Sequence, residues 1–262
     1  MMKLLDTSGA NTKLAKNNAN KKGIYKYLSE RTGHIVNDIR VAGLSLMPDE
    51  RLCPFAEIAE CRAPCLENAG RGRMPNVKTG REKKADFVRE DRQSFLAILR
   101  RELYNFKTLC HKDGQLPVVR LNVLSDVPWE MKLYSEIPQE FEDIYFYDYT
   151  KIASRMRRLP PNYDMMFSWS GTKAYQPSVE KALSTDTPIA VVFDCEFPDI
   201  FLGRPVYDGD QSDILNLTRK NGVIALKAKG KARDLIHPFI VTQEYLNECD
   251  ESFQQTTELL AV

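Results

Sequence analysis

Short apolar segments recur along the chain after residue 40, and each of them ends in a group of polar residues. Segments of this length that are rich in valine, isoleucine and aromatic residues are typical of buried β-strands. The predicted strands are Val41–Leu46, Val118–Leu124, Ile144–Tyr149, Asp164–Trp169, Ile189–Phe193, Pro205–Tyr207 and Val223–Leu226.

Helix-like segments lie between these strands. Apolar residues recur at helical spacing over Lys84–Phe106 and predict a long helix there, and weaker patterns predict helices over Lys151–Arg158 and Val179–Leu183. Strands that alternate with helices favour a mostly parallel sheet. The predicted fold class is therefore α/β, with a partial parallel (β/α) barrel-like domain and a cysteine loop after its first strand.

The two ends of the chain differ from this pattern. Residues 1–40 are polar and rich in lysine and asparagine, which predicts a loosely packed N-terminal arm with a short helix around Gly23–Thr32. Residues 41–240 form the predicted α/β domain, and residues 241–262 form an acidic C-terminal tail or surface helix.

Composition excludes several classes of protein. None of the apolar runs in the 262 residues approaches the roughly 18 residues that span a bilayer, and the first residues lack the apolar stretch of a secretory signal. We therefore expect a cytoplasmic protein without a membrane partner. The net charge of +1 does not by itself predict a nucleic-acid partner, and six cysteines are too few for a disulfide scaffold.

Three of the cysteines are clustered. Seven residues separate Cys53 from Cys61, and three separate Cys61 from Cys65, in a loop that contains prolines and glycines. Clustered thiols in a reducing compartment indicate a metal or iron–sulfur site. Three cysteines leave one position open on a metal ion or on one iron of a 4Fe–4S cluster. The sequence offers Cys110, His111 and Cys195 as candidates for a fourth ligand.

The identity of the metal stays open between two alternatives. Structural zinc sites usually have paired cysteines two residues apart, and that spacing is absent here. The spacing therefore favours an iron–sulfur cluster, with zinc as the alternative. Arg71, which lies in the same loop, is a candidate for holding the charge of a cluster, a phosphate or a carboxylate.

Polar residues follow the predicted strands one after another. In a parallel sheet the carboxyl ends of the strands meet at one edge, so these residues are expected to converge there. This convergence favours an enzyme over a scaffold. The candidate catalytic residues are Asp126, Glu130, Asp148, Lys151, Asp208 and Asp210, and Ser125 and Ser168 are candidates for cofactor binding.

Several motifs together resemble a known family. The run LCPFAEIAECRAPCLENAGRGR is followed in order by RLNVLSDVPWE, FYDYTK, FSWSG, VYDGDQSD and LKAKGKARD. This series resembles the gene product 88 proteins, an uncharacterised phage-encoded family, and it covers roughly residues 40–240. The resemblance implies a phage or prophage origin, and hence the cytoplasm of the host cell.

The cysteine loop after a strand of a parallel sheet is also similar, more distantly, to radical S-adenosylmethionine enzymes. This likeness implies that Cys53, Cys61 and Cys65 bind a 4Fe–4S cluster whose open iron faces a cofactor. It also implies that polar strand-end residues such as Ser125, Asp126 and Glu130 face S-adenosylmethionine.

The sequence also allows a second hypothesis, a zinc-stabilised nucleic-acid-binding or host-interaction protein without catalysis. Its support is two basic segments, Arg155–Arg158 and Lys227–Arg233, with nearby aromatic residues that can stack on bases. Those aromatic residues are Tyr145, Tyr147, Tyr149 and Trp169. The substrate, the reaction and the oligomeric state are not predicted by any pattern in the chain.

Overall fold

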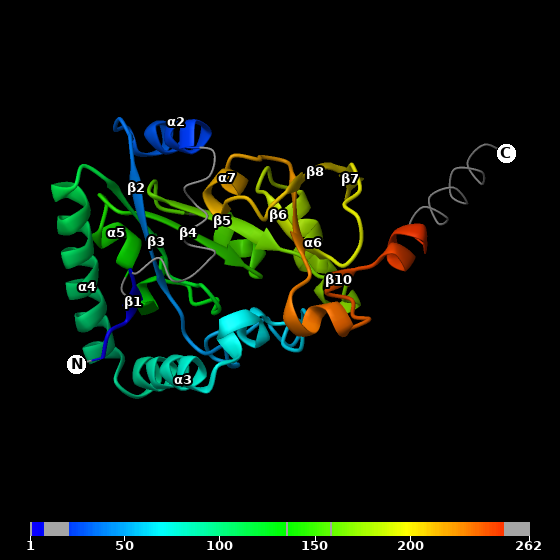
Figure 1. Ribbon diagram of the computed structural model, residues 1–262, viewed down its shortest axis with the longest axis horizontal. Helices are drawn as coiled ribbons and strands as arrows, with labels where there is room; N and C mark the ends of the chain where they lie inside the picture. The colour runs from blue at the N-terminus through cyan, green and yellow to red at the C-terminus, as the bar shows by residue number, and fades with distance from the viewer. Residues whose placement is uncertain (1, 8–20, 135, 158, 249–262) are drawn as a thin grey trace.

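A computed structural model describes residues 2–7, 21–134, 136–157 and 159–248, and shows a ten-stranded sheet with helices on both faces (Figure 1). The strands lie side by side in the order β1-β2-β3-β4-β5-β6-β9-β8-β7, and β10 also pairs with β6. Their bounds are β1 Leu5–Asp6, β2 Ile39–Leu44, β3 Leu116–Arg120, β4 Tyr145–Thr150, β5 Tyr163–Ser168, β6 Ile189–Phe193, β7 Ile200–Phe201, β8 Arg204–Asp208, β9 Val223–Lys227 and β10 Ile240–Val241.

The sheet is mostly parallel, as predicted. Strands β2 to β6 are neighbours in chain order, and every pair among them is parallel. Strands β9 and β8 continue the parallel sheet beyond β6, while the short strands β1 and β7 pair antiparallel at its two ends. The order runs from β1 to β7 without returning to its start, so the sheet is open and the predicted barrel-like form is not confirmed.

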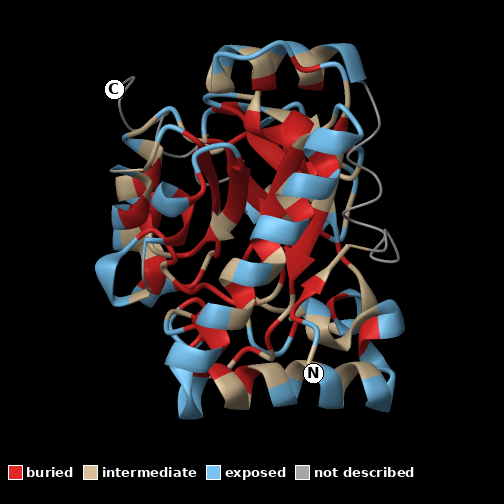
Figure 2. Ribbon diagram, turned by 90° about the vertical axis from the view of Figure 1, so that its left-hand side faces the viewer, coloured by how far each residue is buried: buried red, intermediate tan, exposed pale blue. Residues whose placement is uncertain are grey.

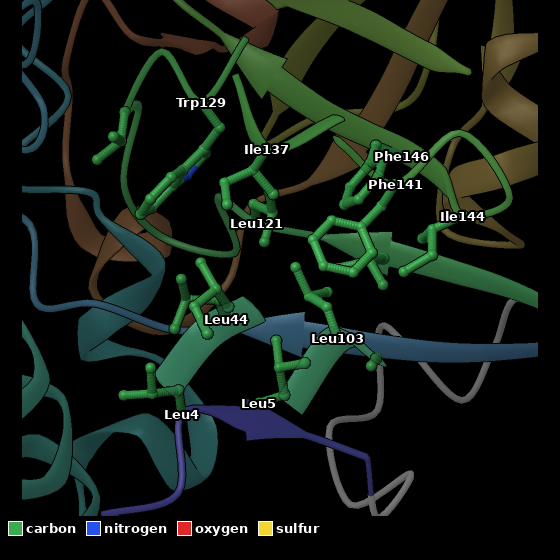
Figure 3. Close-up of a cluster of buried hydrophobic side chains, with 14 of the residues drawn as sticks. Leu4, Leu5, Leu44, Leu103, Leu121, Trp129, Ile137, Phe141, Ile144 and Phe146 are labelled. Atoms are coloured by element: carbon green, nitrogen blue, oxygen red, sulfur yellow. The ribbon is translucent and has the colours of Figure 1, made fainter. Parts of the chain in front are cut away.

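Two helices cover one face of the sheet. α3 (Pro75–Glu90) and α4 (Arg92–Lys112) pack on strands β3 to β5 through a core that includes Leu99, Leu103 and Phe146 (Figure 3). Buried residues of α4 recur every three or four positions, which places them on one stripe of the helix. The short helix α5 (Ile137–Glu140) adds Ile137 to the same core.

The opposite face is covered by α2 (Lys21–Thr32) and α7 (Asp213–Leu217). Ile24 and Leu28 of α2 pack with Tyr145 of β4 and Ile214 of α7 in a second core. Further along the sheet, on the face that α3 and α4 cover, α6 (Gln176–Leu183) forms a third cluster with β5, β6 and β9. The strands between these layers are largely buried, and the outward sides of the helices are exposed (Figure 2).

The single helix predicted over Lys84–Phe106 is in fact two helices. Asp91 ends α3 and caps α4, because its backbone leaves the helical conformation and its side chain accepts a hydrogen bond from the N–H of Ser94 at 3.0 Å. Phe87 and Phe95 remain in edge-to-face contact across the break. This contact explains why the apolar spacing continued through it. Similarly, the helix predicted over Lys151–Arg158 is a 3-10 helix over Ala153–Arg157.

The N-terminal segment was predicted to be a loosely packed arm, but its described residues belong to the layers of the domain. Leu5 pairs with Leu44 of β2, and Arg31 and Tyr27 of α2 both bond the carboxylate of Asp164 in β5. At the other end, residues 242–248 contact the core through Tyr245, and the rest of the predicted acidic tail lies outside the described residues.

No helix in the described part of the chain is long and apolar enough to cross a membrane.

The two faces of α4 provide a test of this packing. Leu99 is fully buried against the sheet, and Leu109 on the same helix is 48% exposed. Leu99→Ala should lower the free energy of unfolding by about 2–5 kcal/mol, because it leaves a cavity in the core. Leu109→Ala should change it by less than about 0.5 kcal/mol. Urea unfolding of both variants checks the prediction, and equal losses would contradict the assignment of the two faces.

Candidate functional site

A cavity of about 170 Å³ opens at the carboxyl ends of the parallel strands. One water molecule needs roughly 10–15 Å³ of such cavity volume, so the cavity has room for a small organic molecule. It is lined by the cysteine loop, by the segments that follow β3, β4 and β9, and by side chains of β5 and β6. Of the predicted site residues, Ser125, Asp126, Lys151 and Ser168 line this cavity together with the three cysteines, so the expected convergence is present for these residues.

The cysteine loop is fixed over the cavity from two sides. The N–H of Asp126 donates to the carbonyl of Leu52 at 2.7 Å, which joins the loop to the segment after β3. The hydroxyl of Ser170 donates to the carbonyl of Ala59 at 2.8 Å, which joins it to the segment after β5. The loop is therefore placed by the strand ends, and its own regular structure is limited to short turns.

A third contact closes the cysteine loop against the 3-10 helix over Gly230–Asp234, seen as cyan against orange in Figure 1. Gly230 has a left-handed backbone, with φ of 61°, and a Cβ atom at this position would lie 2.9 Å from the carbonyl oxygen of Asn68. Both the conformation and the close approach require glycine here.

Cys53, Cys61 and Cys65 all line the cavity, and none of them is in a disulfide. Burial raises the pKa of Cys53 to about 12 and also raises the pKa of Cys65. Free thiols in this setting are protonated at neutral pH, whereas a nucleophilic cysteine needs a lowered pKa. The cavity therefore does not activate Cys53 or Cys65 as a nucleophile. Among the described residues, no group of three or more His, Cys, Asp or Glu side chains has the arrangement of a single-ion site.

The candidates for a fourth metal ligand lie away from the cavity. Cys110 and His111 both belong to α4, where Cys110 is buried in the core and His111 is exposed. Cys195 packs beside β6, where its thiol contacts the carbonyl of Val241. The described residues that line the cavity include no histidine and no fourth cysteine.

Asp126 and Glu130, two of the candidate catalytic residues, form a buried ion group. The guanidinium of Arg155 contacts the Asp126 carboxylate, and it donates two hydrogen bonds of 2.8 Å to that of Glu130. Asp126 also accepts the backbone N–H of Lys151 at 2.8 Å. Asp126 lines the cavity, whereas Glu130 does not, and both carboxylates are held by the fold.

Asp148 lies behind the cavity wall, and its carboxylate accepts hydrogen bonds from the backbone and the side-chain amide of Asn122 and from the hydroxyl of Tyr163. The side-chain oxygen of Asn122 in turn accepts from the hydroxyl of Ser125 and from the indole N–H of Trp129. Asn122 thereby holds the turn that presents Ser125 to the cavity. Asn122 was not among the residues predicted for the site.

Lys151, which directly follows β4, and Ser168, the last residue of the neighbouring strand β5, both line the cavity, as expected. The ammonium of Lys151 donates to the hydroxyl of Ser168 at 2.6 Å and lies 4.7 Å from the centre of the Phe239 ring. The positive charge of Lys151 lowers the pKa of Cys53 and Cys65, against the larger effect of burial. Lys151 is therefore within electrostatic reach of the thiols.

Besides Glu130 and Asp148, three more of the predicted site residues lie outside the cavity lining. Asp210 binds the ammonium of Lys229 and the backbone N–H of Lys227, and Asp208 accepts the backbone N–H of Asp210. These carboxylates hold the turn after β8 against the end of β9. Arg71 is exposed on a 3-10 helix over Gly70–Arg73.

The basic segments of the nucleic-acid hypothesis do not form one surface. Most of the segment Lys227–Arg233 lies beyond strand β9, which ends at Lys227, and Lys229 is paired with Asp210. Arg155 is buried in its ion group. The proposed stacking residues Tyr145, Tyr147 and Trp169 are buried in the core, while Tyr149 lines the cavity beneath the guanidinium of Arg120.

The family model described as Gene product 88 matches residues 2–243, so the chain belongs to the gene product 88 family. No curated protein and no solved structure matches the chain. The family is therefore established, and the likeness to radical S-adenosylmethionine enzymes receives no support from these comparisons.

Breaking the buried ion group around Arg155 should destabilise the fold strongly, whatever the net contribution of the intact group. Arg155→Met leaves two buried carboxylates without a counter-charge and should cost about 3–5 kcal/mol of unfolding free energy. The matched control is Arg100→Met, because Arg100 pairs with Glu140 on the surface, where such pairs contribute less than about 1 kcal/mol. Urea unfolding measures both, and a loss for Arg155→Met no larger than the control would contradict the prediction.

Asp148 should make stability depend on pH. Burial raises its pKa to about 7, above the value of about 3.9 in an unfolded chain. Between these values the folded state holds a proton that unfolding releases, so the folded state loses stability as the pH rises.

Asp148→Asn removes this titration. The unfolding free energy of the unmodified protein, relative to that of Asp148→Asn, should therefore fall by on the order of 1 kcal/mol per pH unit between about pH 5 and pH 7. Urea unfolding across this range tests it, with Asp199→Asn, at an exposed position, as control. Parallel pH profiles for the protein and Asp148→Asn would show that Asp148 does not titrate there.

Proposed function

We propose that this member of the gene product 88 family is a phage-encoded iron–sulfur enzyme that acts on a small molecule in the strand-end cavity. The observation that carries the proposal is that Cys53, Cys61 and Cys65 line the same cavity as Asp126 and Lys151. A cluster bound to three cysteines keeps one iron without a protein ligand. The three cysteines would hold such a cluster at the wall of the cavity in which a small molecule fits.

The number and placement of the thiols favour a cluster over a structural zinc ion. A structural zinc ion requires four protein ligands, and Cys110, His111 and Cys195 all lie away from the cavity. A 4Fe–4S cluster needs no fourth protein ligand when its remaining iron binds a substrate or cofactor. Zinc with an open position is the alternative that metal analysis distinguishes.

The surroundings of Cys65 also fit a negatively charged sulfur group. The Nη1 atom of Arg81 is buried and has no hydrogen-bond partner among the described residues. Burial lowers the pKa of Arg81, while the charges of Cys65 and Glu67 act in the opposite direction, so these groups lie near the guanidinium. Arg81 would thus offer a positive charge and a free N–H donor to a negatively charged group held by Cys65.

When bound, the cluster supplies one-electron chemistry to a ligand on its open iron. The chain's own residues exclude water and orient that ligand. Ser125 and Ser168 present hydroxyl groups to the cavity, and Lys151 presents a positive charge. The candidate cofactor is S-adenosylmethionine, because the cysteine loop after a strand of a parallel sheet is distantly similar to that of the radical S-adenosylmethionine enzymes. Asp126 and Glu130 are positioning residues in this proposal, because Arg155 holds both carboxylates.

Anaerobic purification followed by iron, sulfide and zinc analysis tests the proposal. The protein should contain about four iron and four sulfide per chain and show the broad visible absorption of a cluster. Cys53→Ala, Cys61→Ala and Cys65→Ala should each lose most of this content, while Cys195→Ala, a thiol outside the cavity, should retain it.

Circular dichroism of each variant separates loss of the cluster from loss of the fold. Stoichiometric zinc without sulfide would show that the cysteines bind zinc and not an iron–sulfur cluster. Cluster content that survives all three single substitutions would refute ligation by these cysteines.

A further inference from the structure

The ammonium of Lys151 is a buried charge without a carboxylate partner. The residue is only 8% exposed, and its described contacts are the hydroxyl of Ser168 and the ring of Phe239. An ammonium has three N–H donors, and Ser168 accepts only one of them. A buried charge is costly unless it is paired, so Lys151 is expected to have a further partner.

The nearest candidate in the protein is already engaged. The carboxylate of Asp126 contacts Arg155, and its second oxygen accepts the backbone N–H of Lys151 rather than the ammonium. No ion pair joins Lys151 to any carboxylate of the described residues, although its side chain lines the cavity. The missing partner is therefore expected within the cavity itself.

The other charged residues of the cavity lining are cations, apart from Asp126, whose carboxylate is paired with Arg155. Arg120 is paired with Asp213 at 2.9 Å, and Lys229 is paired with Asp210. Two more lining residues, Lys227 and Arg62, form no ion pair with the described carboxylates. A cavity lined by uncompensated cations attracts anions.

We propose that the cavity binds a small molecule through an anionic oxygen group, a phosphate or a carboxylate, held by the Lys151 ammonium and the Ser168 hydroxyl. Phosphate is favoured, because Lys227 and Arg62 add positive charge at the rim and a phosphate carries more negative charge than a carboxylate. The inference deepens the proposed function by giving the chemical class of the substrate, and it rests on that function only in calling the ligand a substrate.

Titration of the purified protein with inorganic phosphate, and separately with acetate, tests this at constant ionic strength with chloride as background. Binding is measured by calorimetry and by the shift of the melting temperature. Lys151→Met should weaken phosphate binding at least about tenfold, which corresponds to the loss of one charged hydrogen bond. The matched control Lys26→Met, at an exposed position on α2, should leave the affinity unchanged.

The melting temperature without ligand distinguishes binding from a structural role. If Lys151 is uncompensated, Lys151→Met should melt at the same or a higher temperature, and it should lose the phosphate-induced shift. A lower melting temperature for Lys151→Met, together with no phosphate or acetate binding by the unmodified protein, would overturn the proposal. Lys151 would then balance the buried carboxylates of Asp126 and Glu130.

The same titration on the variant with all three cavity cysteines replaced by alanine separates this inference from the proposed function. Phosphate binding by a variant without a cluster supports the anion site on its own. A protein that carries a cluster but binds neither anion would refute the site and leave the cluster standing. Tighter binding of acetate than of phosphate would assign the group as a carboxylate.

Discussion

The shape of the cavity depends on the buried guanidinium of Arg155 between the carboxylates of Asp126 and Glu130. The carboxylates follow β3 and the guanidinium follows β4, so the ion group joins the ends of two neighbouring strands. Asp126 extends this link, because it accepts the N–H of Lys151 and donates its own N–H to Leu52 in the cysteine loop. Buried ion groups contribute little net stability compared with apolar packing. We therefore infer that this one is retained because it fixes the position of the cavity wall.

A second group of hydrogen bonds, around Asn122, supports the ion group around Arg155. Asn122 donates two hydrogen bonds to the carboxylate of Asp148, and its side-chain oxygen holds the turn that contains Ser125. The ion group and the hydrogen bonds of Asn122 both depend on residues 122–130, a segment without regular structure over most of its length. Its conformation is set by side-chain hydrogen bonds to neighbouring strands, so a change in either group of contacts moves the same stretch of cavity wall. Irregular backbone at a site is stable when such contacts determine it completely.

The parallel sheet and the strand-end site were predictable from the sequence, because apolar strands and the polar residues after them are local patterns. The same reasoning found Lys151, Ser168 and the three cysteines, which the structure places around one cavity. It could not separate residues that face the cavity from those that face the core behind it. Glu130 and Asp148 are polar residues near strand ends, yet both are satisfied by distant partners. The partners are 15 to 26 positions away in sequence, and no local period encodes such pairs.

The cysteines and Lys151 place two opposite electrostatic demands on one small space. Burial keeps the thiols of Cys53 and Cys65 protonated, and only a bound cation or metal makes their thiolates stable there. Burial makes the ammonium of Lys151 costly, and only an anion offsets it. Because the charge of Lys151 acts on both thiols, the two demands are coupled. Binding at either position changes the affinity at the other by the same factor, as thermodynamic linkage requires. In the proposed enzyme, the charge state of the cluster and the affinity for an anionic substrate would thus be thermodynamically coupled.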